Sequence, residues 1–191
     1  VAAAAFYNVP MISRDLTIER LAKASELLLV PFGLTEADLS STLGQIATHQ
    51  VDDADLYFQY TRSEGWSLEE GIVKTGSFSI DQGVGVRAVA GEKTAFAYSD
   101  DISRESLLDA ARTVRAISGS ARSGRVKTPR RRVAQSRSLY GALDPLGTLN
   151  STAKVQLLEK IERLARAKDP RVVQVMAGLA AEYDVVLVAR S

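Results

Sequence analysis

The stretch of sequence that decides the fold reads Ile80-Asp-Gln-Gly-Val-Gly-Val-Arg-Ala-Val-Ala-Gly-Glu-Lys93. Between Val84 and Ala90 the apolar residues recur at every second position, which is typical of a strand with one buried face. Gly91-Glu92 follows with glycine first, as a type II′ hairpin requires. The segment therefore predicts a strand, a tight turn and an antiparallel return strand.

The same period of two extends on both sides of this hairpin. Upstream, an alternating strand begins near Ala54, a turn follows at Glu70-Gly71, and Ile72–Ile80 predicts a separate strand before the one at Val84. Two further strand segments close the chain, at Val172–Ala181 and Val185–Ala189.

Four helices are expected around these strands. The first spans Thr17–Val30, and the second has Thr35 as N-cap with Asp38 three residues later, a variant of the capping box. Ser103 caps the third helix. The fourth opens at Asn150 or Ser151 and is expected to bury an apolar face formed by Leu157, Leu158, Ile161, Leu164 and Ala165.

Runs of strands, rather than strands alternating with helices, predict an α+β fold in which helices pack on one antiparallel β-meander sheet. We expect a loose tail at residues 1–14 and a single domain over residues 15–191. The sequence stops at Ser191 directly after a strand-like run and does not begin with Met. We therefore expect it to be a fragment of a longer protein.

Composition limits the chemistry that this chain can perform. Of its 191 residues, 46% are hydrophobic and 25% charged, as in ordinary globular proteins. The absence of Cys excludes disulfides, thiolate nucleophiles and Cys-based zinc sites, and agrees with a reducing compartment. No apolar run approaches the ~20 residues that cross a bilayer, so no membrane contact is expected.

Basic residues gather in a Ser/Gly/Arg-rich connection over residues 119–147, which contains Arg130, Arg131 and Arg132. Nine Lys or Arg residues and no acidic residue lie between Asp109 and Asp144, whereas elsewhere 15 basic residues face 23 acidic ones. The favoured interpretation is a solvated or partner-facing loop. The alternative is a site for a polyanion or nucleic acid over residues 122–137.

Two motifs resemble ligand-binding sites, but a structural role explains each of them better. Gly83-Val-Gly85-Val-Arg-Ala88 matches a dinucleotide-binding pattern, but that chemistry needs the glycines between a strand and a helix. Here they lead into a strand, where glycine permits a bulge, a bend or the close approach of another backbone. His49 has Asp52, Asp53 and Asp55 nearby, but one His without Cys does not make an ordinary zinc site. We predict no catalytic residue and no metal ligand.

Several separated strings together resemble one family, the TldD/PmbA metallopeptidases, and the detail is closer to the TldD subunit than to PmbA (TldE). They are Asp55-Leu-Tyr-Phe-Gln59, Trp66-Ser-Leu-Glu69, Gly76-Ser-Phe-Ser-Ile-Asp-Gln-Gly-Val-Gly-Val-Arg87, Gly91-Glu-Lys-Thr-Ala-Phe-Ala-Tyr98, Lys168-Asp-Pro-Arg-Val-Val-Gln-Val175 and Tyr183-Asp-Val-Val-Leu-Val188. The basic connection is richer in Arg than the family pattern.

The resemblance implies the N-terminal domain of a cytoplasmic zinc peptidase that works with a TldE/PmbA-like subunit on unfolded or extended peptides. Members of the family have also been labelled modulators of DNA gyrase. The family's metal site, a His-Glu-x-x-x-His helix and a Cys, belongs to the C-terminal half and has no counterpart in this sequence. Zinc is therefore expected in the full-length protein and no cofactor in this part.

The resemblance leaves the chain a wall of the substrate chamber, a heterodimer surface or a sheet edge that an extended peptide joins. We predict that the residues that contact a peptide or a partner are Gln82, Gly83, Gly85 and Arg87. A docking module without peptide contact, and the polyanion site on the basic connection, remain as alternatives.

Overall fold

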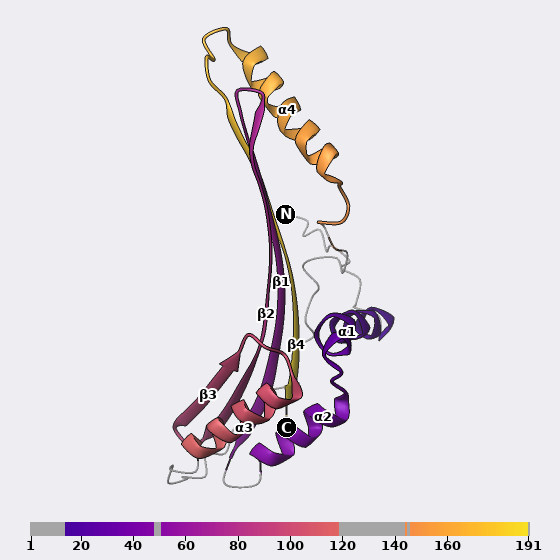
Figure 1. Cartoon of the computed structure of the whole chain (residues 1–191), viewed down its shortest axis with the longest axis vertical. Coiled ribbons are helices and arrows are strands. Elements are labelled where there is room, and N and C mark those ends of the chain that lie inside the picture. The colour runs from indigo at the N-terminus through magenta and orange to yellow at the C-terminus, as the bar shows by residue number, and fades with distance from the viewer. Residues whose placement is uncertain (1–13, 48–50, 119–143, 145, 191) are drawn as a thin grey trace, which may run out of the picture.

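The computed structural model describes residues 14–47, 51–118, 144 and 146–190, and within them it confirms an α+β fold (Figure 1). Helices and strands follow one another as α1 (Arg14–Leu28), the 3₁₀ turn η1 (Val30–Phe32), α2 (Glu36–Ile46), β1 (Asp53–Glu69), β2 (Ile72–Ala90), β3 (Lys93–Ser99), α3 (Arg104–Ser118), α4 (Ser151–Lys168) and β4 (Met176–Arg190).

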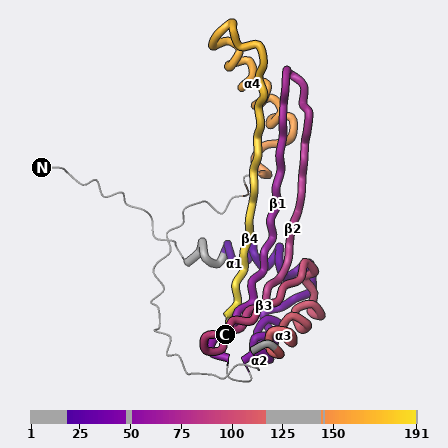
Figure 2. Tube along the Cα trace, turned by 90° about the vertical axis from the view of Figure 1, so that its left-hand side faces the viewer, coloured from indigo at the N-terminus to yellow at the C-terminus, as the bar shows by residue number. Residues whose placement is uncertain are grey.

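One antiparallel sheet of order β3-β2-β1-β4 forms the centre of the molecule. β1, β2 and β4 contain 17, 19 and 15 residues, so at about 3.4 Å per residue they extend for roughly 50–65 Å. β3 has only 7 residues and pairs with one end of β2. The three long strands therefore continue past β3 as a narrow arm, with α4 along its far end (Figures 1 and 2).

Two predicted breaks in the strands are wrong. β2 runs without interruption from Ile72 to Ala90, and β4 joins the two segments expected at the end of the chain. Polar residues interrupt the apolar alternation in both places, but β1 supplies backbone partners along the whole length of each strand. Backbone pairing, which does not depend on side-chain polarity, therefore keeps these strands continuous.

Two tight turns set the register of the meander. Glu70 and Gly71 both have positive φ, 52° and 73°, as the two central residues of a type I′ turn between β1 and β2 require. Glu70 is stabilised in this unusual conformation by a carboxylate that accepts from the Val175 amide at 2.9 Å and from Arg166 at 2.7 Å. Gly91 has φ 60° at the first position of the β2–β3 turn, in agreement with the predicted hairpin.

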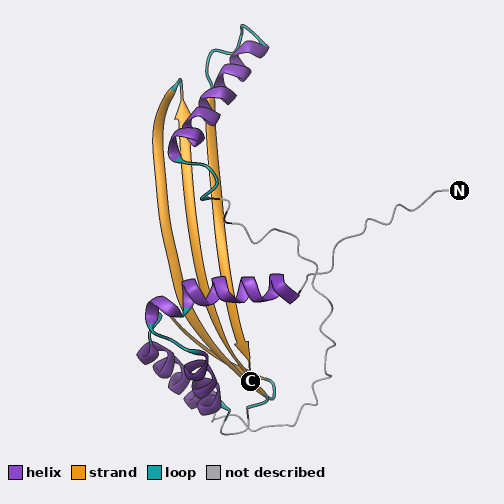
Figure 3. Ribbon diagram, turned by 90° about the vertical axis from the view of Figure 1, so that its right-hand side faces the viewer, coloured by secondary structure: helices purple, strands orange, loops and turns teal. Residues whose placement is uncertain are grey.

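The helices lie on one face of the sheet (Figure 3), and the core lies where α2 and α3 cover it. Leu56, Phe58 and Val86 of the sheet are fully buried against Leu107 and Val114 of α3. The predicted caps are confirmed. Thr35 and Asp38 form a reciprocal capping box at α2, Ser103 Oγ accepts from the Ser106 amide, and Asn150 caps α4.

The predicted buried face of α4 is wrong for three of its five residues. Leu157, Ile161 and Leu164 are exposed, and the helix buries Leu158 together with Lys154 and Glu162. The Lys154 ammonium reaches Glu64 on β1 at 2.5 Å and donates to the Leu146 carbonyl at 2.9 Å. Glu162 pairs with Arg166 at 3.1 Å on the buried side of the helix. Ion pairs, rather than the leucine stripe, therefore set the rotation of α4.

No helix in the part of the chain that the structure describes is long and apolar enough to cross a membrane.

Candidate functional site

The face of the sheet opposite the helices is not covered by any described helix (Figures 2 and 3). It carries the side chains of β1 that alternate with the buried ones, together with their register partners on the neighbouring strands. We call it the open face. Across the end of the sheet that includes β3, one row runs from Tyr98 over Gly85 and Tyr57 to Val188.

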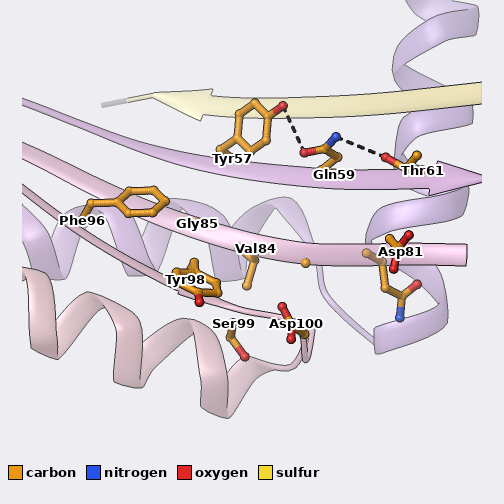
Figure 4. A pocket seen from close by; sticks show the side chains of 12 residues that line it. Tyr57, Gln59, Thr61, Asp81, Val84, Gly85, Phe96, Tyr98, Ser99 and Asp100 are labelled. Carbon is orange, nitrogen blue, oxygen red and sulfur yellow. Dashed lines mark hydrogen bonds between the residues drawn. The ribbon is translucent and has the colours of Figure 1, made fainter.

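A cavity of about 320 Å³ lies in the open face, where β1, β2 and β3 run side by side (Figure 4). Tyr57 and Gln59 of β1 form one wall, and Phe96 and Tyr98 of β3 form the other. The Phe96 and Tyr98 rings are partly stacked, with centroids 6.3 Å apart and planes at 22°. The cavity is therefore flanked by aromatic rings on two sides.

Glycines of β2 make the floor of this cavity. A side chain at Gly83 would place its Cβ 2.9 Å from the Ser99 carbonyl oxygen, and one at Gly85 would place it 2.9 Å from the Phe96 ring. Gly83 therefore needs glycine for the close approach of a backbone, whereas the neighbour of Gly85 is an exposed ring that can move. Close approach of another backbone is one of the roles that the sequence predicted for these glycines, and Gly83 shows it.

Three of the four residues predicted for peptide or partner contact line the cavity, namely Gln82, Gly83 and Gly85. Arg87 does not. It lies one row further along the open face, where its guanidinium donates to the Asp55 carboxylate from Nε at 2.8 Å and from Nη2. This hydrogen bond raises the pKa of Arg87 against the opposing effect of burial. Arg87 is therefore committed to an ion pair within the sheet.

The acidic residues near Asp53 are neutralised in the same way. Arg190 of β4 donates to Asp53 through Nε at 2.6 Å and Nη2 at 2.8 Å, and Arg87 lies 3.9 Å from the same carboxylate. Asp52 accepts from the Gly91 amide at 2.6 Å. These contacts link the three longest strands at the end of the sheet where α2 and α3 pack.

A line of hydrogen bonds crosses the wall that β1 gives to the cavity. The Tyr57 hydroxyl donates to Gln59 at 3.5 Å and the Gln59 amide donates to Thr61 Oγ1 at 3.1 Å (Figure 4). Thr61 in turn donates to Asp184 of β4. This chain fixes the Gln59 side chain along the cavity.

Asp81 and Asp100 also line the cavity, and sequence reasoning did not select them or the aromatic walls. The alternation of Phe96 and Tyr98 in the return strand was visible in the sequence. It identified a strand face, but only the β2–β3 register shows that this face stands over the glycines.

The outer edge of β2 is a second feature of this region. β3 pairs with β2 only from Val84 to Ala90, so Gly85 is not at a free edge, whereas Gly83 lies just past the last paired residue. Beyond it, residues 72–82 pair with β1 alone among the described residues, and every one of them is exposed. Phe78 and Ile80 are among them, with exposed fractions of 63% and 49%.

No group of three or more His, Cys, Asp or Glu side chains within residues 14–47, 51–118, 144 and 146–190 is arranged to hold a metal ion. His49, and the basic connection with Arg130, Arg131 and Arg132, lie outside the described residues. The proposed polyanion site therefore stays a prediction.

Comparison with known proteins agrees with the resemblance in the sequence. Residues 54–118 match the family described as PmbA/TldA metallopeptidase domain 1. The chain is 41% identical over 168 residues to a metalloprotease TldD homologue of Haemophilus influenzae, covering 88% of this chain and 35% of that protein. A metalloprotease TldD homologue of Buchnera aphidicola is 39% identical over 168 residues, covering 88% and 34%. The chain thus spans about a third of the length of these relatives.

Solved structures share the fold at low sequence identity. A proposed modulator of DNA gyrase from Bacteroides thetaiotaomicron matches with a TM-score of 0.63 at 12% identity, covering 81% of this chain and 36% of that one. TldE from Thermococcus kodakarensis matches with a TM-score of 0.54 at 16% identity, covering 80% and 35%. The family match, the identity to TldD homologues and the shared fold lead to one conclusion: this chain contains an N-terminal domain of the TldD/PmbA family.

Proposed function

We propose that this chain is the non-catalytic N-terminal domain of a TldD-like zinc metallopeptidase that cleaves unfolded or extended peptides in the cytoplasm. The observation that carries the proposal is the 41% identity to a metalloprotease TldD homologue across 88% of the chain. In this proposal the full-length protein pairs with a TldE/PmbA-like subunit.

The side chains present do not fit a zinc site. Zinc in proteins takes three or four protein ligands, mostly His and Cys. The sequence contains no Cys and one His. The acidic residues that follow His49 in the sequence are held by other partners, Asp53 by Arg190 and Asp55 by Arg87. We therefore assign metal binding and bond cleavage to the remainder of the full-length protein.

The domain contributes surfaces for polypeptide. The free edge of β2 over residues 72–82 presents backbone donors and acceptors that an extended strand can join. Main-chain hydrogen bonds do not depend on side-chain identity, so this mode of binding suits unfolded peptides of varied sequence. The exposed Phe78 and Ile80 add apolar area for a neighbouring subunit or for the substrate.

The test compares this chain with a full-length TldD relative combined with its TldE-like subunit. Each is loaded with zinc, desalted, and assayed for bound metal by elemental analysis and for cleavage of an unfolded peptide. We expect no stoichiometric zinc and no hydrolysis from the 191-residue chain alone. Tight one-to-one zinc together with chelator-sensitive hydrolysis by this chain would overturn the proposal.

A photo-crosslinking residue in place of Phe78 separates the two surface roles in the full-length complex. Crosslinks to a labelled peptide support a substrate-contacting edge, and crosslinks to the partner subunit alone support a docking role. A matched crosslinker in place of Glu105, on the exposed surface of α3, controls for random capture. Equal labelling at the two positions would contradict both roles for the β2 edge.

A further inference from the structure

The cavity in the open face combines two kinds of groups that favour a cation. Its walls present the rings of Tyr57, Phe96 and Tyr98, with exposed fractions of 39%, 57% and 74%. The face of an aromatic ring attracts a guanidinium or ammonium group electrostatically. Its end carries the carboxylates of Asp81 and Asp100 (Figure 4).

These two carboxylates differ from the other acidic groups on the open face. Asp53 and Asp55 are paired with arginines, and Asp184 accepts from Thr61. Among the described residues, Asp81 and Asp100 have no hydrogen-bond or ion-pair partner, and both are exposed. No Lys, Arg or His contributes to the lining, so the cavity carries a charge of −2 that nothing described neutralises.

The backbone brings the two carboxylates to the same place. Asp81 lies two residues before Gly83 on the same face of β2, roughly 7 Å away at the usual rise of a strand. A Cβ at Gly83 would lie 3.6 Å from the Asp100 Cα, so Asp100 stands beside that glycine. The glycine floor leaves the space between the carboxylates and the rings open.

The volume indicates the size of the occupant. A cavity of about 320 Å³ is at the lower end of the ~300–1,000 Å³ range of ligand pockets. It suits one long side chain rather than a folded partner, and its negative charge disfavours a phosphate backbone. A planar guanidinium can stack on a ring and donate two parallel hydrogen bonds to a carboxylate, which an ammonium cannot do.

We propose that this cavity is a subsite for an arginine side chain of an extended peptide, held between the Phe96–Tyr98 wall and the carboxylates of Asp81 and Asp100. The identification of the ligand as a peptide rests on the proposed function. Within it, the subsite adds a preference for a basic residue to a backbone grip that is otherwise independent of sequence.

The test measures binding of fluorescein-labelled Gly-Ser-Ala-Arg-Ala-Ser-Gly to the 191-residue chain by anisotropy, beside peptides with lysine or citrulline in place of the arginine. Citrulline keeps the shape of arginine and removes its charge. We expect the arginine peptide to bind about tenfold more tightly than the citrulline peptide. An exposed cation–π contact contributes a factor of ~2 to 5, an exposed ion pair contributes about as much, and the two factors multiply. Lysine should lie between them, and the advantage should shrink as NaCl rises from about 50 to 500 mM.

Asp81→Asn and Asp100→Asn should each reduce the preference for arginine, and the double variant should reduce it to the ~2- to 5-fold that the rings alone provide. Glu92→Gln, at an exposed position in the β2–β3 turn, is the matched control that loses the same charge elsewhere and should keep the preference. Tyr98→Leu should weaken arginine more than citrulline. Circular dichroism of each variant checks that the fold is retained.

Equal affinity for arginine and citrulline peptides in the unmodified chain, or a preference for arginine that the double variant does not reduce, overturns the subsite. The subsite is also overturned if none of the three peptides binds to the unmodified chain. None of these results bears on zinc content or hydrolysis, so the proposed function fails or stands by its own test.

Discussion

Replacing Gly83 with alanine tests the close approach that builds the cavity floor. The added Cβ would lie 2.9 Å from the Ser99 carbonyl oxygen, a backbone atom that moves only if the β2–β3 pairing moves. Overpacking of this kind costs ~1–3 kcal/mol. Alanine also restricts the unfolded chain, which returns about 0.4–1 kcal/mol. We therefore expect a net loss of about 1–2 kcal/mol in the free energy of unfolding.

Two other glycines calibrate this value. Gly44 lies in α2, and a Cβ added there would meet nothing within 4 Å, so Gly44→Ala should stabilise the protein by about 0.5–1 kcal/mol. At Gly85 the close atom belongs to the exposed Phe96 ring, which can rotate away, so Gly85→Ala should change stability by less than about 1 kcal/mol.

Urea unfolding followed by circular dichroism measures all three variants, and thermal unfolding should show Gly83→Ala about 2–8 °C below the unmodified chain. A Gly83→Ala variant as stable as the unmodified chain, while Gly44→Ala gains stability, would contradict the backbone contact. The cavity floor would then need a different explanation.

Three further predictions concern the arm. Lys154→Met should cost about 3–5 kcal/mol because it leaves the Glu64 carboxylate buried without its partner, and adding Glu64→Leu should recover most of that loss in urea unfolding. The Val175 amide and then the Arg166 guanidinium lower the pKa of Glu70, so its contribution to the stability of the fold is present above its ordinary pKa of 4.5 and is lost as the pH falls below it. Glu70→Gln should therefore flatten the decline in the free energy of unfolding measured from about pH 6 to pH 2. An unchanged slope would contradict the assignment. Leu158→Ala should cost ~2–5 kcal/mol in the same assay and Leu164→Ala less than about 0.5 kcal/mol, whereas equal losses would mean that α4 is rotated differently.

The parts of the fold that sequence reasoning predicted correctly depend on local signals. The Thr35–Asp38 capping box, the Gly91 turn and the alternation before Tyr60 each involve residues within a few positions of one another. Such contacts form whatever the rest of the chain does, so a short window of sequence is enough to identify them.

The face of α4 could not be predicted in this way because its partners are distant in the sequence. Lys154 contacts Glu64, and Arg166 contacts Glu70, each across roughly ninety positions. A lysine is buried favourably only beside a carboxylate that pairs with it, and the sequence does not show that Glu64 of β1 lies next to α4. By hydrophobic pattern alone, Leu157 and Ile161 were the better candidates for the buried side.

The candidate site shows the same division. Gly83 and Gly85 could be selected from the sequence because glycines within a strand permit close approach, and both line the cavity. Of the groups that give the cavity its chemistry, Phe96, Tyr98 and Asp100 come from β3 and the loop after it, and the register Gly85↔Tyr98 brings them there. A shift of that register by one residue would turn Phe96 and Tyr98 to the helix-covered face and leave the glycines open.

The set of side chains on the open face is therefore determined by which side chains the helix-covered face must bury. Burial of Leu56, Phe58 and Val86 under α2 and α3 fixes which side chains of β1 and β2 point away from the helices. At the covered end, arginines neutralise the acidic groups that point outward, as at Asp55. Where β3 ends, Asp81 and Asp100 are left without such a partner among the described residues. This charge, which no described residue balances, is the reason to look there for an arginine side chain of a bound peptide.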